Sequence, residues 1–296
     1  MPPAGHERSR MPQPLSEARE PVNILYYGDG GTGKTTALAT MANLGKVLII
    51  NAESGVKSRP LKERGVKVEN IEVFPGPGEA VTFDALEELW LGVREELNKN
   101  PDAYAGVVWD SVTEIYKTLL DSVVAKAADR AKKKGVDRER FFIAREDYGV
   151  MTEQVRALVR KYRDLPCHFG VSALARREQD DDASVTYQPA ITPALQNDLI
   201  GWVDVVCWTS VAAVGGVEEF RGLFAPHGKY RGKDRLGAVP KWLVDPTFER
   251  VLGYVERKLE SKSDAVMVAA RKRAEQAKSD GAPPTGAEEK EAVASG

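Results

Sequence analysis

Residues 28–35 of the chain are GDGGTGKT; they follow an apolar run, VNILYY (22–27), and lead into a segment of helical character, TTALATMA (35–42). The octapeptide matches the pattern G-x-x-x-x-G-K-[ST] in full, in the strand–turn–helix context that a phosphate-binding loop requires. Glycines allow backbone N–H groups to turn inward around phosphates, and the helix N-terminus adds its positive dipole end. The pattern favours such a loop over an ordinary glycine-rich turn. The residues predicted to bind the nucleotide are Gly28, Asp29, Gly30, Gly31, Thr32, Gly33, Lys34, Thr35 and Thr36.

Two side chains of this loop have distinct predicted roles. Lys34 is expected to contact the β- and γ-phosphates, where its charge assists catalysis, and the Thr35 hydroxyl is expected to bind Mg²⁺. The predicted ligands are therefore ATP and Mg²⁺.

Two carboxylates follow predicted strands. Asp110 closes AGVVWD (105–110) and is the expected second Mg²⁺ ligand, directly or through water, although it also suits the N-cap of the next helix. Glu53 ends KVLIINAE (46–53), at the sheet edge where ligands collect. We predict that Glu53 polarises the attacking water; the alternative is an exposed loop acid.

Composition excludes several classes of protein. The 42 Lys and Arg and 44 Asp and Glu residues give a net charge of −2, so the chain as a whole is not strongly basic. Any contact with nucleic acid must therefore come from local patches of positive charge. The sequence contains neither a signal-peptide pattern nor an apolar run of about 20 residues, so we expect a cytoplasmic protein with no membrane partner. Cys167 and Cys207 lie in apolar runs and are expected in the core.

Predicted strands alternate with helices, which indicates an α/β fold: a mainly parallel central sheet flanked by helices. The segments 204–214 and 217–226, joined by two glycines, predict an antiparallel hairpin at the sheet edge. Residues 175–193 lack helical period and are expected to form a loop. We predict a flexible arm over 1–20, one core over 21–260, and a fraying helix with a disordered tail over 261–296.

The loop at 28–35, with Glu53 and Asp110, resembles the RecA-like ATPases, and KDRLG (233–237) resembles the Lys-Asn-Arg-Phe-Gly motif of their RadA branch. The nearest likeness is to the small phage RecA-like proteins of the Sak-type single-strand annealing group. It covers about residues 21–260 and implies a RecA-like P-loop fold. It also implies that Lys233 and Arg235 reach the ATP of a neighbouring subunit. The alternative is an ordinary solvated loop, because residues 229–235 contain four cations within seven positions.

By the same resemblance, the DNA-binding loops fall near 130–147 and 176–192. Cations and aromatic rings suit single-strand binding, but interleaved acids in the first loop also fit a solvated helix end. In the second loop Glu178 and the acids at 180–182 would repel phosphates, so it binds little DNA or its acids serve another partner or Mg²⁺. The candidate DNA-binding residues are Arg130, Lys132, Lys133, Lys134, Arg138, Arg140, Arg176 and Arg177.

The expected function is therefore that of an ATP-dependent recombination or annealing protein. It would bind single-stranded DNA, hydrolyse ATP and assemble with itself as a ring or filament. The C-terminal tail is a candidate contact for a single-strand-binding or other replication protein. The alternatives are an AAA+ helicase loader or packaging motor, a small-molecule phosphotransferase, and a nucleotide-dependent scaffold that does not turn over. Only about one helix follows Pro240, whereas AAA+ proteins normally add a helical lid.

Overall fold

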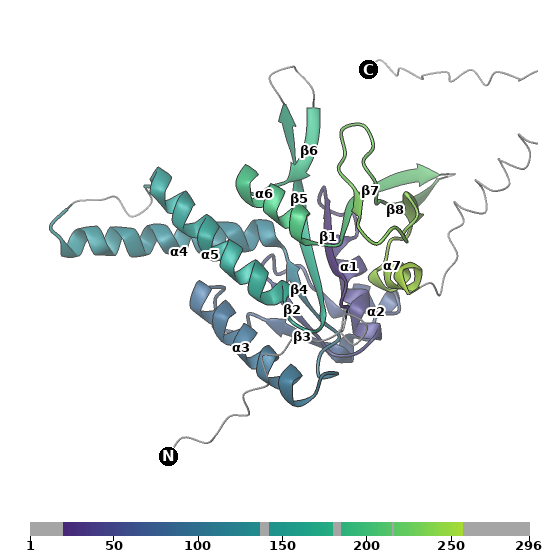
Figure 1. Cartoon of the computed structure of the whole chain (residues 1–296), viewed down its shortest axis with the longest axis horizontal. Coiled ribbons are helices and arrows are strands. Elements are labelled where there is room, and N and C mark those ends of the chain that lie inside the picture. Colours follow the sequence, from purple (N-terminus) through teal and green to yellow (C-terminus); the bar gives the residue numbers. More distant parts are fainter. Residues whose placement is uncertain (1–19, 137–141, 180–184, 215, 257–296) are drawn as a thin grey trace, which may run out of the picture.

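The computed structural model describes residues 20–136, 142–179, 185–214 and 216–256. Its centre is a sheet in the order β10-β8-β7-β1-β5-β4-β2-β3 (Figure 1). The strands from β7 to β3 run parallel to one another, β8 pairs antiparallel with β7, and β10 pairs antiparallel with β8. The bounds along this order are β10 (Trp242–Val244), β8 (Val217–Leu223), β7 (Val205–Val214), β1 (Asn23–Gly28), β5 (His168–Gln179), β4 (Gly106–Asp110), β2 (Val47–Asn51) and β3 (Ile71–Phe74).

Helices cover both faces of the sheet, and each face has its own apolar cluster. In the first cluster, Trp109 of β4 packs edge-on against Tyr162 and Phe169, with ring centroids 5.3 and 5.8 Å apart. The parallel α/β fold with an antiparallel edge hairpin is confirmed. The helices of this face are α3 (Phe83–Lys99), α4 (Val112–Lys133), α5 (Arg145–Arg163) and α6 (Pro193–Trp202), and the opposite face holds α1 (Lys34–Ala39), α2 (Ser58–Glu63) and α7 (Phe248–Val255).

Polar side chains mark where the helices begin. The Thr82 hydroxyl accepts from the Ala85 N–H at 3.1 Å before α3, and the Asp147 carboxylate accepts from the Ala144 N–H at 2.7 Å in the first turn of α5. Ser111 is the N-cap of α4, since its hydroxyl accepts from the Glu114 N–H. The alternative that Asp110 caps this helix is therefore wrong, and its carboxylate has other partners.

The loop expected over 175–193 is wrong: β5 continues through Gln179 and pairs antiparallel with β6 (Val185–Pro189). Arg177 lies opposite Tyr187 in this ladder, and the hairpin projects from one end of the sheet (Figure 1). Absence of a helical period does not distinguish a loop from an extended hairpin, and the run Val-Thr-Tyr at 185–187 favours a strand.

Both predicted terminal segments lie outside the described residues, apart from Glu20. Cys167 and Cys207 are both buried, as expected of core residues. None of the helices in the described ranges combines the length and apolar character that a membrane crossing requires.

Candidate functional site

The phosphate loop joins the end of β1 to the start of α1. Gly31 and Gly33 have φ of 76° and 81°, the left-handed region that glycine enters without strain. Gly28 has a steric reason for being glycine, because a Cβ there would lie 2.4 Å from the Thr209 hydroxyl of β7. That hydroxyl lies 2.7 Å from the Thr32 hydroxyl, so β7 braces the loop from the side.

Lys34 turns its ammonium back into the loop. It donates to the carbonyl oxygens of Gly28 at 3.0 Å and Asp29 at 2.6 Å, and the side chain is buried. Burial lowers the pKa of Lys34, while the Glu53 and Asp110 carboxylates act in the opposite direction. A buried ammonium among backbone dipoles suits an anionic ligand such as a triphosphate.

Each carboxylate oxygen of Asp110 accepts a hydrogen bond from a hydroxyl group. The Thr35 hydroxyl donates to one oxygen at 2.8 Å, and the Ser172 hydroxyl of β5 donates to the other at 2.5 Å. Burial raises the pKa of Asp110, while these two hydrogen bonds lower it. Thr35 and Asp110, 75 positions apart, thus form a pair of hard oxygen donors of the kind that Mg²⁺ prefers.

Glu53 is held beside Asp110 by the pairing of β2 with β4. Asn51 lies opposite Asp110 in that ladder, and the Glu53 N–H donates to the Asp110 carbonyl at 3.3 Å. The Ser111 hydroxyl donates to the Glu53 carboxylate. Glu53 is exposed, so water has access to it, and its charge is the largest influence raising the pKa of Lys34. The site therefore brings together an ammonium, three hydroxyls and two carboxylates.

A comparison with protein families agrees with this arrangement. A family model described as an AAA domain matches residues 20–236, well over half of the chain. The chain belongs to the AAA domain family. A search of curated proteins found no match. Membership indicates a nucleotide-dependent ATPase-type domain, which agrees with the predicted P-loop α/β fold; the Sak-type group remains a prediction.

A groove in this AAA domain continues from the phosphate loop along the face that carries α1. The Phe220 ring of β8 packs on Gly33, and the Arg64 guanidinium lies 4.7 Å from the centre of that ring. A cavity of about 230 Å³ is lined by these two side chains together with Thr36, Thr40, Glu218, Glu219, Val244, Asp245 and Thr247. Arg64 and Phe220 stand in no sequence motif, so their place beside the phosphate loop could not be predicted from the sequence.

Lys233 and Arg235 lie far from the phosphate loop of their own AAA domain. Lys233 belongs to β9 (Lys233–Asp234), which pairs with the first residues of β7, whereas the phosphate loop follows the last residue of β1. The Lys233 ammonium donates to the carbonyls of Ile200 and Val203 at 2.7 Å, at the end of α6. Arg235 donates to the Asp204 carboxylate at 3.0 Å. The two cations therefore lie toward the N-terminal end of β7, whereas the phosphate loop lies at the C-terminal end of the neighbouring β1.

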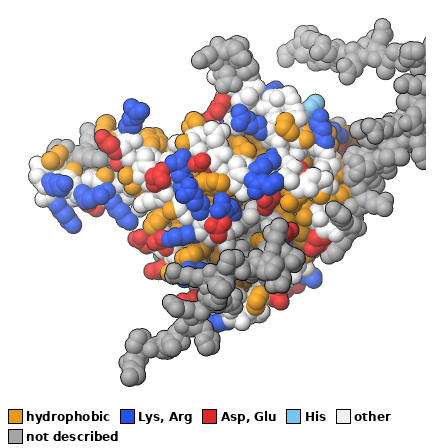
Figure 2. Space-filling view, in the orientation of Figure 1, with side chains coloured by type: hydrophobic (Ala, Val, Ile, Leu, Met, Phe, Trp, Pro, Cys, Tyr) orange, Lys and Arg blue, Asp and Glu red, His pale blue; other side chains and the backbone are white. Residues whose placement is uncertain are grey.

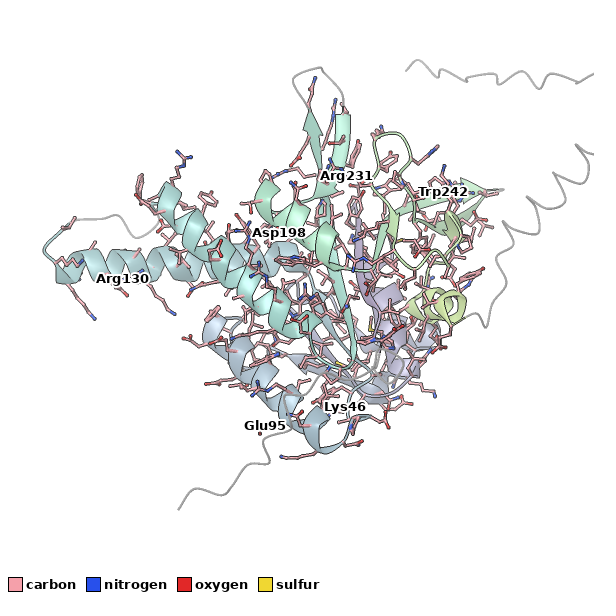
Figure 3. All side chains as sticks on the ribbon, in the orientation of Figure 1. Lys46, Glu95, Arg130, Asp198, Arg231 and Trp242 are labelled. Carbon is pink, nitrogen blue, oxygen red and sulfur yellow. The ribbon has the colours of Figure 1, made fainter. Side chains whose placement is uncertain are left out.

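The candidate DNA residues divide between two projections of the AAA domain. Arg130 lies on the end of α4 that extends beyond the sheet (Figure 3), and Lys and Arg side chains gather there (Figure 2). On the β5–β6 hairpin, Arg176 is paired with Glu178, and Arg177 is exposed. Lys132, Lys133 and Lys134 follow Arg130 at the end of α4, whereas Arg138 and Arg140 lie outside the described residues.

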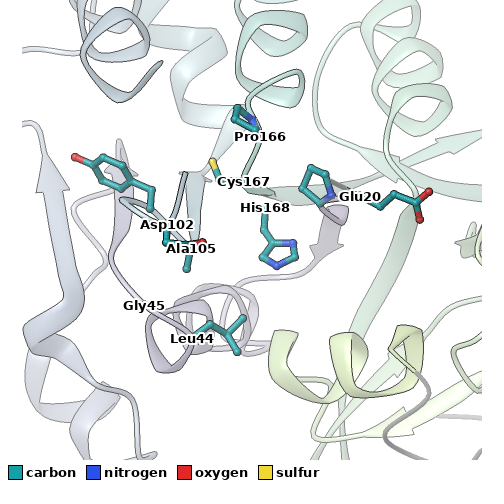
Figure 4. A pocket seen from close by; sticks show the side chains of 10 residues that line it. Glu20, Leu44, Gly45, Asp102, Ala105, Pro166, Cys167 and His168 are labelled. Atoms are coloured by element: carbon teal, nitrogen blue, oxygen red, sulfur yellow. The ribbon is translucent and has the colours of Figure 1, made fainter. Parts of the chain in front are cut away.

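A cavity of about 420 Å³ at the other edge of the AAA domain is a separate feature. It lies at the N-terminal ends of β4 and β5, away from the phosphate loop, and the His168 ring faces Leu44 across it (Figure 4). The His168 Nδ1 accepts from the Val22 N–H at 2.9 Å, which ties this wall to the start of β1. The cavity is distinct from the nucleotide site.

Proposed function

We propose that the protein is a Mg²⁺-dependent ATPase that binds single-stranded DNA, assembles with itself, and promotes recombination or annealing as a RecA-like protein of the Sak-type group. The observation that carries the ATPase proposal is the meeting of Lys34, Thr35, Asp110 and Glu53 at the ends of β1, β4 and β2. Each of these residues has the chemistry that phosphoryl transfer to water requires.

The roles follow from the chemistry of each side chain. The Lys34 ammonium neutralises charge on the β- and γ-phosphate oxygens, and the Glu53 carboxylate accepts the proton of the attacking water. Thr35 and Asp110 hold Mg²⁺, and Ser172 orients the Asp110 carboxylate. When bound, Mg²⁺ supplies charge neutralisation on the triphosphate. In the adjoining groove, the Arg64 guanidinium, which lies over the Phe220 ring, offers a flat surface to the nucleobase.

Substitution of Glu53 by Gln tests the catalytic assignment. The amide keeps the size of the side chain but accepts a proton poorly, so we expect ATP binding to persist while hydrolysis slows by about 10²- to 10⁴-fold. Binding is measured with a fluorescent ATP analogue and turnover by phosphate release. Normal turnover in the folded variant would exclude Glu53 as the base.

The DNA and assembly parts of the proposal rest on cations away from the phosphate site. The α4 end and the β5–β6 hairpin present exposed cations, and Arg235 is exposed beside the partly buried Lys233. ATPase assays with and without single-stranded DNA separate this function from its rivals. Stimulation by DNA supports it; turnover of a small acceptor molecule favours a phosphotransferase, and nucleotide binding without turnover favours a scaffold.

A further inference from the structure

A line of aromatic side chains crosses the end of the sheet beside the β5–β6 hairpin. The Tyr230 ring stacks on Trp208 with centroids 3.7 Å apart, and the Tyr187 and Tyr230 ring centroids are 5.2 Å apart. Trp242 of β10 lies 6.4 Å from Trp208, and His227 lies 6.0 Å from Trp242. We call these five residues the aromatic row; they come from β6, β7, β10 and the segment between β8 and β9.

Cations accompany the rings. The Lys229 ammonium lies 5.2 Å from the centre of the Tyr187 ring and 5.6 Å from that of Tyr230. The Lys241 ammonium lies 3.3 Å from the Nδ1 atom of His227. Arg231 is exposed next to Tyr230, and Figure 3 shows it on the same side of the molecule as Trp242. Blue side chains gather over this region in Figure 2. The local charge therefore favours an anionic partner.

Part of the aromatic row is open to solvent. Trp242 is 43% exposed, which is unusual for the largest apolar side chain, while Tyr187 and Tyr230 are half-buried. An exposed ring beside cations is the arrangement with which proteins bind unpaired bases and their phosphates. A duplex stacks its bases internally, so a flat ring surface of this kind selects single strands.

The aromatic row also contacts the phosphate site through short paths. Trp208 is followed by Thr209, whose hydroxyl lies 2.7 Å from that of Thr32 in the phosphate loop. The Tyr27 hydroxyl, one residue before the loop, bonds the backbone N–H and the carbonyl of Arg231, both at 2.8 Å. A ligand that reorients the Tyr230 segment therefore acts on groups that touch the nucleotide loop.

We propose that the aromatic row is a contact surface for single-stranded DNA, with bases on the rings of Trp242 and Tyr187 and phosphates on Lys229 and Lys241. This inference deepens the proposed function and rests on it. It places a DNA contact beside the β5–β6 hairpin, in addition to the cations predicted at the end of α4.

The test uses the full chain and a fluorescent oligo(dT) strand, with binding followed by anisotropy over a range of salt concentrations. Trp242→Ala should weaken binding about 5- to 150-fold, and Trp242→Phe, which keeps a ring, much less. Lys229→Ala should lower the slope of log affinity against log salt by about 0.7. The matched control is Lys99→Ala, an exposed cation at the end of α3, which should change neither quantity.

An abasic strand of equal length isolates stacking from charge. The wild-type protein should bind the abasic strand more weakly than oligo(dT). In Trp242→Ala the ratio of the two affinities should be smaller. If wild type binds oligo(dT) but Trp242→Ala and Lys229→Ala behave like the control, the aromatic row is not the site and the proposed function stands. If wild type binds no single strand with or without ATP, both proposals fall. Should Trp242→Ala lose thermal stability, the salt slope of Lys229→Ala and the wild-type preference for oligo(dT) over the abasic strand decide the question.

Discussion

The Asp110 carboxylate is held from two sides, by Thr35 of the phosphate loop and by Ser172 of β5. Only Thr35 and Asp110 are proposed to bind the metal, so Ser172 acts through Asp110 as a positioning residue. Such outer partners of metal-binding carboxylates contribute strongly to affinity because they fix the direction of the lone pairs.

Ser172→Ala should raise the Mg²⁺ concentration for half-maximal ATPase activity by about 10- to 100-fold. The hydroxyl is fully buried, and its loss leaves one Asp110 oxygen without its donor. A magnesium titration of turnover measures the effect, with Ser210→Ala of β7 as the control. A lower thermal midpoint with an unchanged Mg²⁺ requirement would assign Ser172 a structural role alone.

Sequence reasoning found the members of this site that belong to a local pattern. Lys34 and Thr35 stand in a contiguous motif, and Asp110 and Glu53 each follow an apolar run. Ser172 and Thr209 were missed because their contacts depend on which strands lie beside β1 and β4, and long-range register has no local signature. The signal that was available was a hydroxyl residue within each apolar strand, Ser172 in HFGVSAL and Thr209 in VVCWTSV.

At the scale of elements, the C-terminus of α6 has an unusual cap. The Lys233 ammonium donates to three backbone carbonyls there, those of Ile200, Gly201 and Val203. The last carbonyls of a helix carry partial negative charge and lack partners within the helix. Burial and the neighbouring Arg235 lower the pKa of Lys233, while Asp204 acts in the opposite direction. The three hydrogen bonds engage the ammonium within its own subunit.

Lys233→Ala should therefore reduce the free energy of unfolding by about 1–2 kcal/mol, as expected for the loss of charge-assisted hydrogen bonds. Urea denaturation followed by circular dichroism measures the change. Lys241→Ala, which removes a nearby exposed cation, serves as the control for charge. Unchanged stability in Lys233→Ala would leave the ammonium available to a neighbouring subunit's ATP.

The projecting end of α4 leads to a second prediction at this scale. Replacing Lys132, Lys133 and Lys134 together by Ala should weaken single-strand binding and flatten its salt dependence, by about 0.7 in the log–log slope for each lost phosphate contact. The same oligo(dT) assay measures it. If the triple variant has the same slope of log affinity against log salt as wild type, these lysines do not contact the DNA and belong to a solvated helix end.

Helices and strands could be predicted from the sequence where apolar residues recur with a clear helical or strand period. The α4–α5 pair, with its break near Gly135, and the β7–β8 hairpin match expectation. The β5–β6 hairpin was not foreseen, because its outer half alternates among charged and polar residues with no buried face to impose a period. The aromatic row was missed for a related reason: its rings come from segments that only the sheet topology brings together.

For the whole molecule, the central question is whether Arg235 acts on the ATP of a neighbour. Arg235→Ala should bind ATP almost normally, because its own phosphate loop is intact, yet hydrolyse poorly. A mixture of Arg235→Ala and Lys34→Ala subunits should recover part of the activity, since some interfaces then pair a working pocket with a working arginine. Pull-down establishes the mixed oligomers first. In proven mixed oligomers, an absence of recovery would end the proposal.

The placement of Arg235 and the phosphate loop toward opposite ends of the parallel strands has an arithmetical consequence. If each subunit offers its arginine at one pole and its pocket at the other, contacts repeat head to tail. An open chain of n subunits then holds n − 1 complete pockets, because the pocket at one terminus has no donor, whereas a closed ring holds n. Turnover per subunit would climb with protein concentration toward a plateau as chains lengthen, and a ring of fixed size would jump to its full rate in one step. Enzyme dilution alone therefore distinguishes the two assemblies.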